Sequence, residues 1–379
     1  MVGLYIHIPF CKKKCPYCDF LSYVTTDSKK IKTILAAVER ELGLWAKDPY
    51  VSSLIFSTLY IGGGTPSLVD KEDLKNIVKK AFQLFNWDQK VEFTIEANPE
   101  SLTKDWLDAL VDVGLTRISI GIQDLTEKGL KRLGRIHSLK QGLSAIEMAK
   151  GFRQLDISVD IIYNWPGQGI EDIKTTLSSL LFFKPHHISA YELNIEPKTT
   201  FYALYKKGKL KLQDEERSEN IYKFLIKELK KHNYHRYEIS NFSLKGHECK
   251  HNINYWENGI YLGIGPGAVS FLPPIRGKNP SGFKSYLQAI NSAKIPFWIE
   301  TEKLDKKARF RESVILALRM TKGFNINEME QKWGFNALKY YNSTISRLIS
   351  QKLLILENNR IFLSDKGIRL SNFVFRELV

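Results

Sequence analysis

Three of the four cysteines lie within eight residues near the start of the chain, directly after a short apolar stretch at residues 4–8. Cys11, Cys15 and Cys18 have the spacing Cys-x3-Cys-x2-Cys. This spacing is too tight for disulfides among all three, but a loop wrapped around one inorganic centre brings three short side chains together. Thiolates favour zinc or an iron-sulfur cluster. The chain must therefore fold so that this loop presents three thiols to one metal centre.

Two alternatives to a cluster are weaker. A structural zinc site needs a fourth ligand nearby, such as a second Cys-x2-Cys or a histidine pair, and none follows the motif. Buried thiols that act as small apolar side chains are the other alternative. Lys12, Lys13 and Lys14 separate the first two cysteines, so the loop must contact solvent, and positive charge favours the ligating thiolate. The pattern favours a [4Fe-4S] cluster with one iron free of a protein ligand.

The motif resembles the signature of radical S-adenosylmethionine enzymes, in which the open iron binds the amino and carboxylate groups of that cofactor. The longer string Tyr5-Ile-His-Ile-Pro-Phe-Cys11 resembles one subgroup more closely. That subgroup contains the oxygen-independent coproporphyrinogen III oxidase and the heme chaperone family HemW. The resemblance covers essentially the whole chain.

Composition narrows the class of protein. The 379 residues, 43% of them hydrophobic, are enough for one large domain and a smaller one. Cys249 is left without a partner, so no disulfide framework is expected, and an oxygen-labile cluster fits a cytoplasmic location. We expect neither a secretory signal nor a transmembrane segment. The net charge of +15 favours anionic partners: nucleic acid, an anionic lipid surface contacted peripherally, or a carboxylated small molecule.

Strand and helix patterns alternate over the first half of the chain. This alternation implies right-handed β-α-β units and a parallel sheet, and the lack of a dinucleotide fingerprint favours an open, partial (β/α)6 barrel of the α/β class. The expected strands are 4–8, 57–61, 91–96, 117–121, 156–163 and 187–193. The expected helices are 28–47, one from about 71, one from about 103, 128–133, 139–150 and 170–183.

The rest of the chain is expected to extend this barrel and to add a small domain. A helix at 214–231 and a strand at 237–239 follow, and the glycine-rich stretch 259–270 is expected to pack over the barrel mouth. Helices at 304–319, 327–334 and 336–352 and two strands around 358–359 resemble a winged helix. The predicted division is 1–240 for the barrel core, 241–300 for a segment packing on that core, and 301–379 for the winged-helix-like domain.

Glycines and polar residues lie at the carboxyl ends of the predicted strands, where β/α barrels build their sites. Gly62, Gly63 and Gly64 let a backbone approach a ligand closely, although a tight strand-to-helix turn is an alternative reason for them. The family resemblance implies contacts with the first S-adenosylmethionine from Tyr5, Gly63, Gly64, Thr65 and Glu96. Gln123, Arg135 and Asp160 match positions that, in the oxidase, contact that cofactor or a second one.

A second motif, His251-Asn252-x2-Tyr255-Trp256, resembles the motif associated with heme binding in HemW. Neutral imidazole is a good axial ligand for heme iron, and Tyr255 and Trp256 offer flat apolar area for a porphyrin. His247 and Cys249 are alternative ligands. The alternative for His251 is a packed histidine beside core aromatic side chains.

The expected function is that of a heme chaperone, which binds heme and passes it to an acceptor protein that the sequence does not identify. The first alternative is an oxygen-independent coproporphyrinogen III dehydrogenase. The oxidase pattern has one more cysteine two positions after the third and an extension before the motif, whereas this chain has Phe20 at that position and ten residues before Cys11. We therefore expect no oxidase activity.

The second alternative is a nucleic-acid-binding protein. Residues 301–379 hold 15 Lys and Arg against 8 Asp and Glu, a net charge of +7. The expected recognition helix at 336–352 offers only Lys339, Arg347 and Lys352 as cations, which is sparse for a helix that follows phosphates. A structural role for this domain is favoured over nucleic-acid binding.

Overall fold

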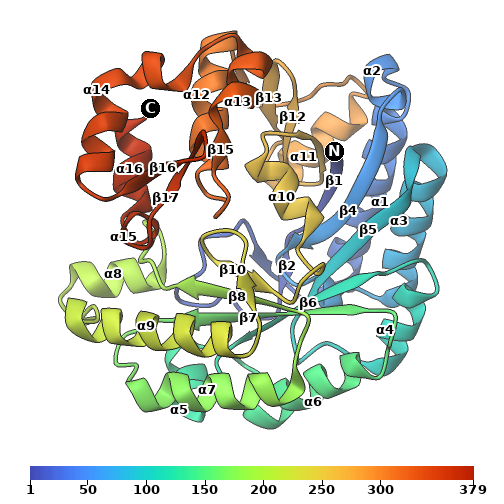
Figure 1. Cartoon of the computed structure of the whole chain (residues 1–379). Coiled ribbons are helices and arrows are strands. Elements are labelled where there is room, and N and C mark those ends of the chain that lie inside the picture. The colour runs from blue at the N-terminus through green and yellow to red at the C-terminus, as the bar shows by residue number, and fades with distance from the viewer.

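A single sheet of twelve strands passes through most of the molecule, and the computed structural model describes all residues from 1 to 379 (Figure 1). Its centre consists of six neighbouring parallel strands in chain order. This arrangement confirms the open, partial barrel, because the sheet curves without closing on itself. The six strands are β1 (Val2–Ile8), β4 (Ile55–Gly63), β5 (Asn86–Ala97), β6 (Arg117–Gln123), β7 (Asp156–Tyr163) and β8 (His187–Glu192).

Helices cover the convex face of this sheet. Alternate residues of β6, such as Ile118 and Ile120, are fully buried in the main core, whereas Arg117 and Ser119 face the cavity inside the barrel. Side chains of a strand alternate between two faces, so this pattern fixes which face the helices cover. The helices are α1 (Ser28–Trp45), α3 (Lys71–Leu84), α4 (Lys104–Val111), α5 (Glu127–Arg132), α6 (Leu139–Lys150), α7 (Ile170–Phe183) and α9 (Glu215–Lys231).

Side-chain caps set where several of these helices begin. Asp27 and Asp70 each accept hydrogen bonds from two backbone N–H groups in the first turns of α1 and α3. Ser138 and Gln141 form a capping box at the start of α6. Such caps satisfy backbone donors that have no partner within the helix. Short elements connect the larger ones: β2 (Phe10–Cys11), β3 (Tyr23–Val24), α2 (Pro49–Ser52), a 3-10 turn (Pro66–Leu68) and α8 (Thr200–Lys206).

Both edges of the sheet differ from the sequence prediction. At one edge, β10 (Asn241–Ser243) pairs with β8, and β9 (His235–Arg236) pairs with β10, both antiparallel. In the sequence, these two strands flank residues 237–239, where a strand was predicted. That prediction is wrong because the Glu238 carboxylate accepts the Ser240 N–H and closes a turn there.

The glycine-rich stretch 259–270 is part of the sheet, so its predicted place over the barrel mouth is wrong. It forms β11 (Ile260–Ile264) and the first half of β12 (Val269–Leu272). Leu262 and Ile264 of β11 pair with β1 in parallel register and are buried in the main core. Gly263 has the Val269 backbone where a Cβ would lie, so glycine permits close approach of the strands. β13 (Ile275–Lys278) and β14 (Glu300–Lys303) complete this edge.

The C-terminal region has a hydrophobic core of its own. Seventeen buried residues between Phe310 and Leu378 form it, whereas the main core of 58 residues extends from Leu4 to Ile290. Three helices followed by a two-stranded hairpin appear in the predicted order of a winged helix, and a short strand after the first helix was not predicted. The three-range division of the chain itself stays a prediction. The elements are α12 (Lys306–Ala317), β15 (Phe324–Asn325), α13 (Ile326–Trp333), α14 (Ala337–Ser350), β16 (Leu354–Glu357), β17 (Arg360–Leu363), α15 (Asp365–Arg369) and α16 (Ser371–Glu377).

Two further helices precede this region. The helix α10 (Lys250–Trp256) contacts β1 and β4 of the barrel and α12 of the C-terminal region, so it lies between the two cores (Figure 1). The helix α11 (Phe283–Asn291) packs against α1. None of the helices combines the length and the apolar character that crossing a membrane would require.

Candidate cofactor site

A cavity of about 320 Å³ opens at the carboxyl ends of the central strands and extends into the barrel. It is lined by residues from the cysteine loop, the glycine run and the strand ends. Most of the residues predicted for the cluster and for S-adenosylmethionine are therefore brought together. They are Cys11, Cys15, Cys18, Gly63, Gly64, Thr65, Glu96, Gln123 and Asp160.

The three cysteines present partly exposed thiols to this cavity, and two of those thiols have a hydrogen-bond donor. The Thr65 hydroxyl lies 3.6 Å from Cys11 Sγ, and the Arg135 guanidinium lies 3.5 Å from Cys15 Sγ. Burial raises the pKa of the Cys18 thiol to about 11. Donors aimed at sulfur suit thiolates bound to iron, and three soft ligands around one cavity fit a [4Fe-4S] cluster.

At each of the three positions of the glycine run, the structure explains why a residue with a side chain would not fit. A Cβ at Gly62 would lie 2.8 Å from the Glu96 carboxyl, and Gly63 has φ of +114° with His7 against its open side. At Gly64 a Cβ would lie 2.6 Å from the Phe10 carbonyl oxygen. The Gly64 N–H also donates to the backbone of β1, so this turn packs directly on the start of the cysteine loop. Cofactor contact by Gly63 and Gly64 stays a prediction.

Glu96 fixes the glycine run from the neighbouring strand. Its carboxylate accepts the Gly63 N–H at 2.9 Å and the Tyr60 hydroxyl at 2.8 Å. Burial raises the pKa of Glu96 to about 7. Tyr60 was not among the predicted site residues, although it lies on β4 three residues before Gly63 and lines the cavity.

Arg135 holds three segments of the site together without lining the cavity. Its guanidinium donates to Asn98 Oδ1 and to the Gly121 carbonyl, each at 2.7 Å, and to the thiol of Cys15. Asn98 in turn donates to Thr65 Oγ1 at 3.0 Å. Asn98 was not predicted as a site residue, although its position directly after β5 places it at the carboxyl end of that strand. Arg135 is therefore a positioning residue for the cysteine loop and for the ends of β5 and β6.

Gln123 has a left-handed backbone, with φ of +68°, at the end of β6. The pairing of β6 with β7 shifts register between Gly121 and Gln123, so the strand turns its last residue toward the cavity. Such strained conformations often occur at functional sites. The sequence showed that Gln123 ends a strand but gave no sign of this conformation.

Asp160 lies deeper in the cavity and is held by serines of the adjacent strands. The Ser119 hydroxyl donates to its carboxylate at 3.1 Å, and burial raises the pKa of Asp160 to about 6. Ser158 and Ser189 also line the cavity from the inward face of β7 and β8. These serines were missed, and the available signal was a small polar residue at every second position of otherwise apolar strands.

The other predicted residues lie outside the cavity. The Tyr5 hydroxyl is hydrogen-bonded to His7 Nδ1 at 2.8 Å, below the cavity lining. His251 is 1% exposed, and both of its ring nitrogens are engaged, by Thr58 at 2.7 Å and by Tyr255 at 3.0 Å. Trp256 stacks under the Arg319 guanidinium at the C-terminal region. In this conformation His251 offers no free nitrogen to iron.

Comparisons with known proteins agree with this geometry. Residues 5–180 match the Radical SAM superfamily, and residues 304–370 match the HemN C-terminal domain. The heme chaperone HemW of Lactococcus lactis is 35% identical over 99% of this chain and 96% of that protein. The chain belongs to the HemW family. HemW of Bacillus subtilis is 32% identical over 99% of this chain and 98% of that protein.

A solved structure shows the same fold. Coproporphyrinogen III oxidase (HemN) from Escherichia coli, described as a radical SAM enzyme, has a TM-score of 0.87 over 100% of this chain and 89% of that one. The two sequences are 23% identical, so this likeness establishes the fold. The match to the Radical SAM superfamily implies a [4Fe-4S] cluster and S-adenosylmethionine.

Proposed function

We propose that this chain is a heme chaperone, which binds heme and transfers it to an acceptor protein. The observation that carries the proposal is the similarity to HemW proteins along the whole chain, from the cysteine loop to the C-terminal domain. The cavity with its three thiols supports the same assignment, because it retains the residues for a bound cluster. The acceptor remains to be identified.

We propose that Cys11, Cys15 and Cys18 hold the cluster and that S-adenosylmethionine occupies the cavity beside it. When bound, the cluster supplies an iron without a protein ligand, which can bind the cofactor's amino and carboxylate groups. The chain's own contribution is to fix this space: Arg135 orients the cysteine loop, and Glu96 orients the glycine run. Asp160 and Gln123 limit the far side of the cavity.

The chain differs from the oxidase pattern at the position of Phe20. Phe20 stands where the oxidase pattern has a further cysteine, and its side chain is 63% exposed at the rim of the cavity. A radical reaction requires a site closed against water and stray hydrogen donors. Here the cavity rim carries an exposed phenylalanine in place of the oxidase's cysteine, which supports the chaperone over coproporphyrinogen III dehydrogenase.

Nucleic-acid binding receives no support from the C-terminal domain. Arg347, one of three cations on the expected recognition helix, is ion-paired with Glu377. We propose a cytosolic location, because four free cysteines and an oxygen-labile cluster suit a reducing compartment.

The test uses anaerobically purified protein with a reconstituted cluster. Heme is titrated while the Soret band is followed, and the heme-loaded protein is then mixed with a heme-free hemoprotein. We expect saturable binding and transfer. The same preparation, supplied with S-adenosylmethionine and a reductant, should not convert coproporphyrinogen III to protoporphyrinogen IX. Multiple turnovers of that conversion would replace the chaperone assignment by the oxidase.

A further inference from the structure

The start of α10, the helix that carries the His251 motif, is held by a side chain of the barrel. The Glu92 carboxylate on β5 accepts the N–H groups of Lys250 and His251, each at 3.0 Å. Cys249, the residue before the helix, makes no side-chain cap of its own. The first N–H groups of a helix have no partner within the helix, so an acceptor from outside satisfies them. Glu92 therefore caps α10 from a strand that is distant in the sequence.

Arg117 joins this cap to the segment that leads into the helix. Its guanidinium lies 3.6 Å from the Glu92 carboxylate and 2.9 Å from the Asp156 carboxylate. It also donates to the His247 carbonyl at 3.1 Å. Arg117 is 3% exposed and Glu92 is 8% exposed, and removing one partner of a buried ion pair leaves the other charge uncompensated. Charged side chains of β5, β6 and β7 thus converge on residues 247–251.

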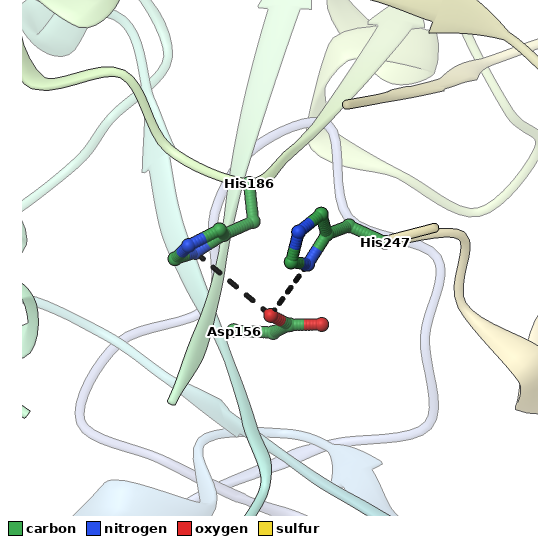
Figure 2. A group of neighbouring side chains, drawn as sticks. All are labelled: Asp156, His186 and His247. Atoms are coloured by element: carbon green, nitrogen blue, oxygen red, sulfur yellow. Dashed lines mark hydrogen bonds and ion pairs between the residues drawn. The ribbon is translucent and has the colours of Figure 1, made fainter. Parts of the chain in front are cut away.

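The third contact with this segment belongs to the amino-end group, which consists of Asp156, His186 and His247. Asp156 begins β7, His186 directly precedes β8, and His247 lies in the loop between β10 and α10. Figure 2 shows both imidazole rings on the same side of the Asp156 carboxylate. His247 Nδ1 lies 2.7 Å from Asp156 Oδ1, and because a carboxylate only accepts hydrogen bonds, the imidazole donates. The loop is therefore fixed two residues before Cys249.

A second chain of hydrogen bonds connects the start of α10 with the cofactor cavity. The Cys249 N–H donates to the Tyr237 hydroxyl at 3.3 Å, and that hydroxyl lies 2.9 Å from His187 Nε2. His187 Nδ1 in turn lies 2.8 Å from the Ser158 hydroxyl. His187, Ser158, Cys249 and Arg117 all line the cavity. The cavity wall and the start of α10 therefore belong to one buried polar network.

We propose that Glu92 is a positioning residue for heme binding, and that its carboxylate, held by Arg117, sets the orientation of the helix that carries the His251 motif. This inference rests on the proposed heme-chaperone function. The helix α10 has seven residues, and an isolated helix of that length is not stable in water. Without Glu92, the start of the helix must be ordered when heme binds. That ordering reduces the binding-competent fraction of the protein and so lowers the apparent heme affinity.

The test follows the Soret band while heme is added to full-length, cluster-reconstituted chains. Glu92→Gln keeps the length of the side chain, but its NH2 group accepts no N–H and the ion pair with Arg117 is lost. We expect heme affinity to fall about five-fold, as for the loss of a helix cap, while iron and sulfide content stays at the wild-type level.

Glu41→Gln is the matched control. Glu41 is also a buried carboxylate that accepts a backbone N–H, that of Gly265 at 2.8 Å, and none of its hydrogen-bond partners belongs to α10. Its heme affinity should equal that of the wild-type chain. An equal loss of affinity in both variants would show a general effect of removing a buried charge and would overturn the proposal.

A rescue experiment tests the capping role directly. Cys249 has the extended backbone of an N-cap residue, with φ of −75° and ψ of 110°. In Glu92→Gln/Cys249→Ser, the new hydroxyl can accept the His251 N–H or the N–H after it, so heme affinity should return toward the wild-type value. A double variant that binds heme as weakly as Glu92→Gln would show that Glu92 does not act by capping α10.

The outcomes separate this inference from the proposed function. If the wild-type chain binds no heme, the chaperone proposal fails. If it binds heme and Glu92→Gln keeps the wild-type affinity, only the positioning role fails. Circular dichroism and reconstituted iron content verify the fold of each variant. If Glu92→Gln does not fold, Glu92→Asp decides, because it keeps the charge beside Arg117 and only withdraws the carboxylate from α10. The same loss of affinity is then expected, and wild-type affinity would overturn the proposal.

Discussion

The two ends of the central sheet are built in different ways. At the carboxyl ends, the site depends on backbone geometry: three glycines, the left-handed Gln123 and a cysteine loop that packs on the glycine run. At the amino ends, Asp156, His186 and His247 are ordinary side chains at the starts of regular strands and in two loops. The carboxyl end therefore depends on backbone conformations that few residues adopt, whereas the amino-end group depends only on which side chains are present.

One residue connects the two ends. Arg117 begins β6, lines the floor of the cavity, and donates to Asp156 and to the His247 carbonyl. No other residue is shared by the cavity lining and the contacts of the Asp156–His247 pair described above. Arg117 is therefore the side chain through which the cavity and the Asp156–His247 pair are in contact.

The largest expected effect is the loss of the cluster at the carboxyl ends of the strands. Replacing Cys11, Cys15 or Cys18 singly by alanine should abolish cluster binding, because two thiolates do not hold a cubane in a partly exposed loop. Cys249→Ala should leave the cluster intact, since that thiol is buried beside Glu92, away from the loop. Iron and sulfide analysis measures both.

A smaller effect is expected from the backbone of the carboxyl end. Gly64→Ala should lower the free energy of unfolding by about 1–3 kcal/mol, the usual cost of overpacking, because its Cβ would meet the Phe10 carbonyl. Gly43→Ala is the control: Gly43 lies within α1 with no atom within 4 Å of an added Cβ. Alanine there should stabilise by about 0.5–1 kcal/mol. Urea unfolding of the cluster-free chains measures both.

Most residues of the predicted carboxyl-end site line one cavity, because they belong to local motifs at strand ends. The cysteine spacing, the glycine run and Glu96 each follow a strand that the hydrophobic pattern reveals, and parallel strands end at the same edge. The HemW resemblance was confirmed by near full-length similarity. The positioning roles of Arg135 and Asn98 were not visible, because a side chain that links three segments leaves no periodic signal.

The grouping of Asp156, His186 and His247 was not predicted from the sequence, which offered His247 only as an alternative heme ligand. Asp156 and His247 are 91 positions apart, and Arg117 and His247 are 130 apart, so only the folded sheet brings them together. The prediction for residues 259–270 was wrong for a different reason. Its glycines suggested a loop, but in β11 and β12 they permit close strand approach while Leu262 and Ile264 supply the buried face.

The smallest effect is a pH dependence that belongs to the carboxyl end. Burial raises the pKa of Glu96 to about 7, whereas an unfolded glutamate titrates near about 4.3. Between these values the folded chain binds more protons than the unfolded chain, so stability falls as pH rises through this window. Glu96→Gln has no proton to lose, so its unfolding midpoint should vary less between pH 5 and 7, about the span of these pKa values. Urea midpoints of the cluster-free chains measure this difference, and parallel pH profiles for the two chains would show that Glu96 is ionised in the folded protein throughout.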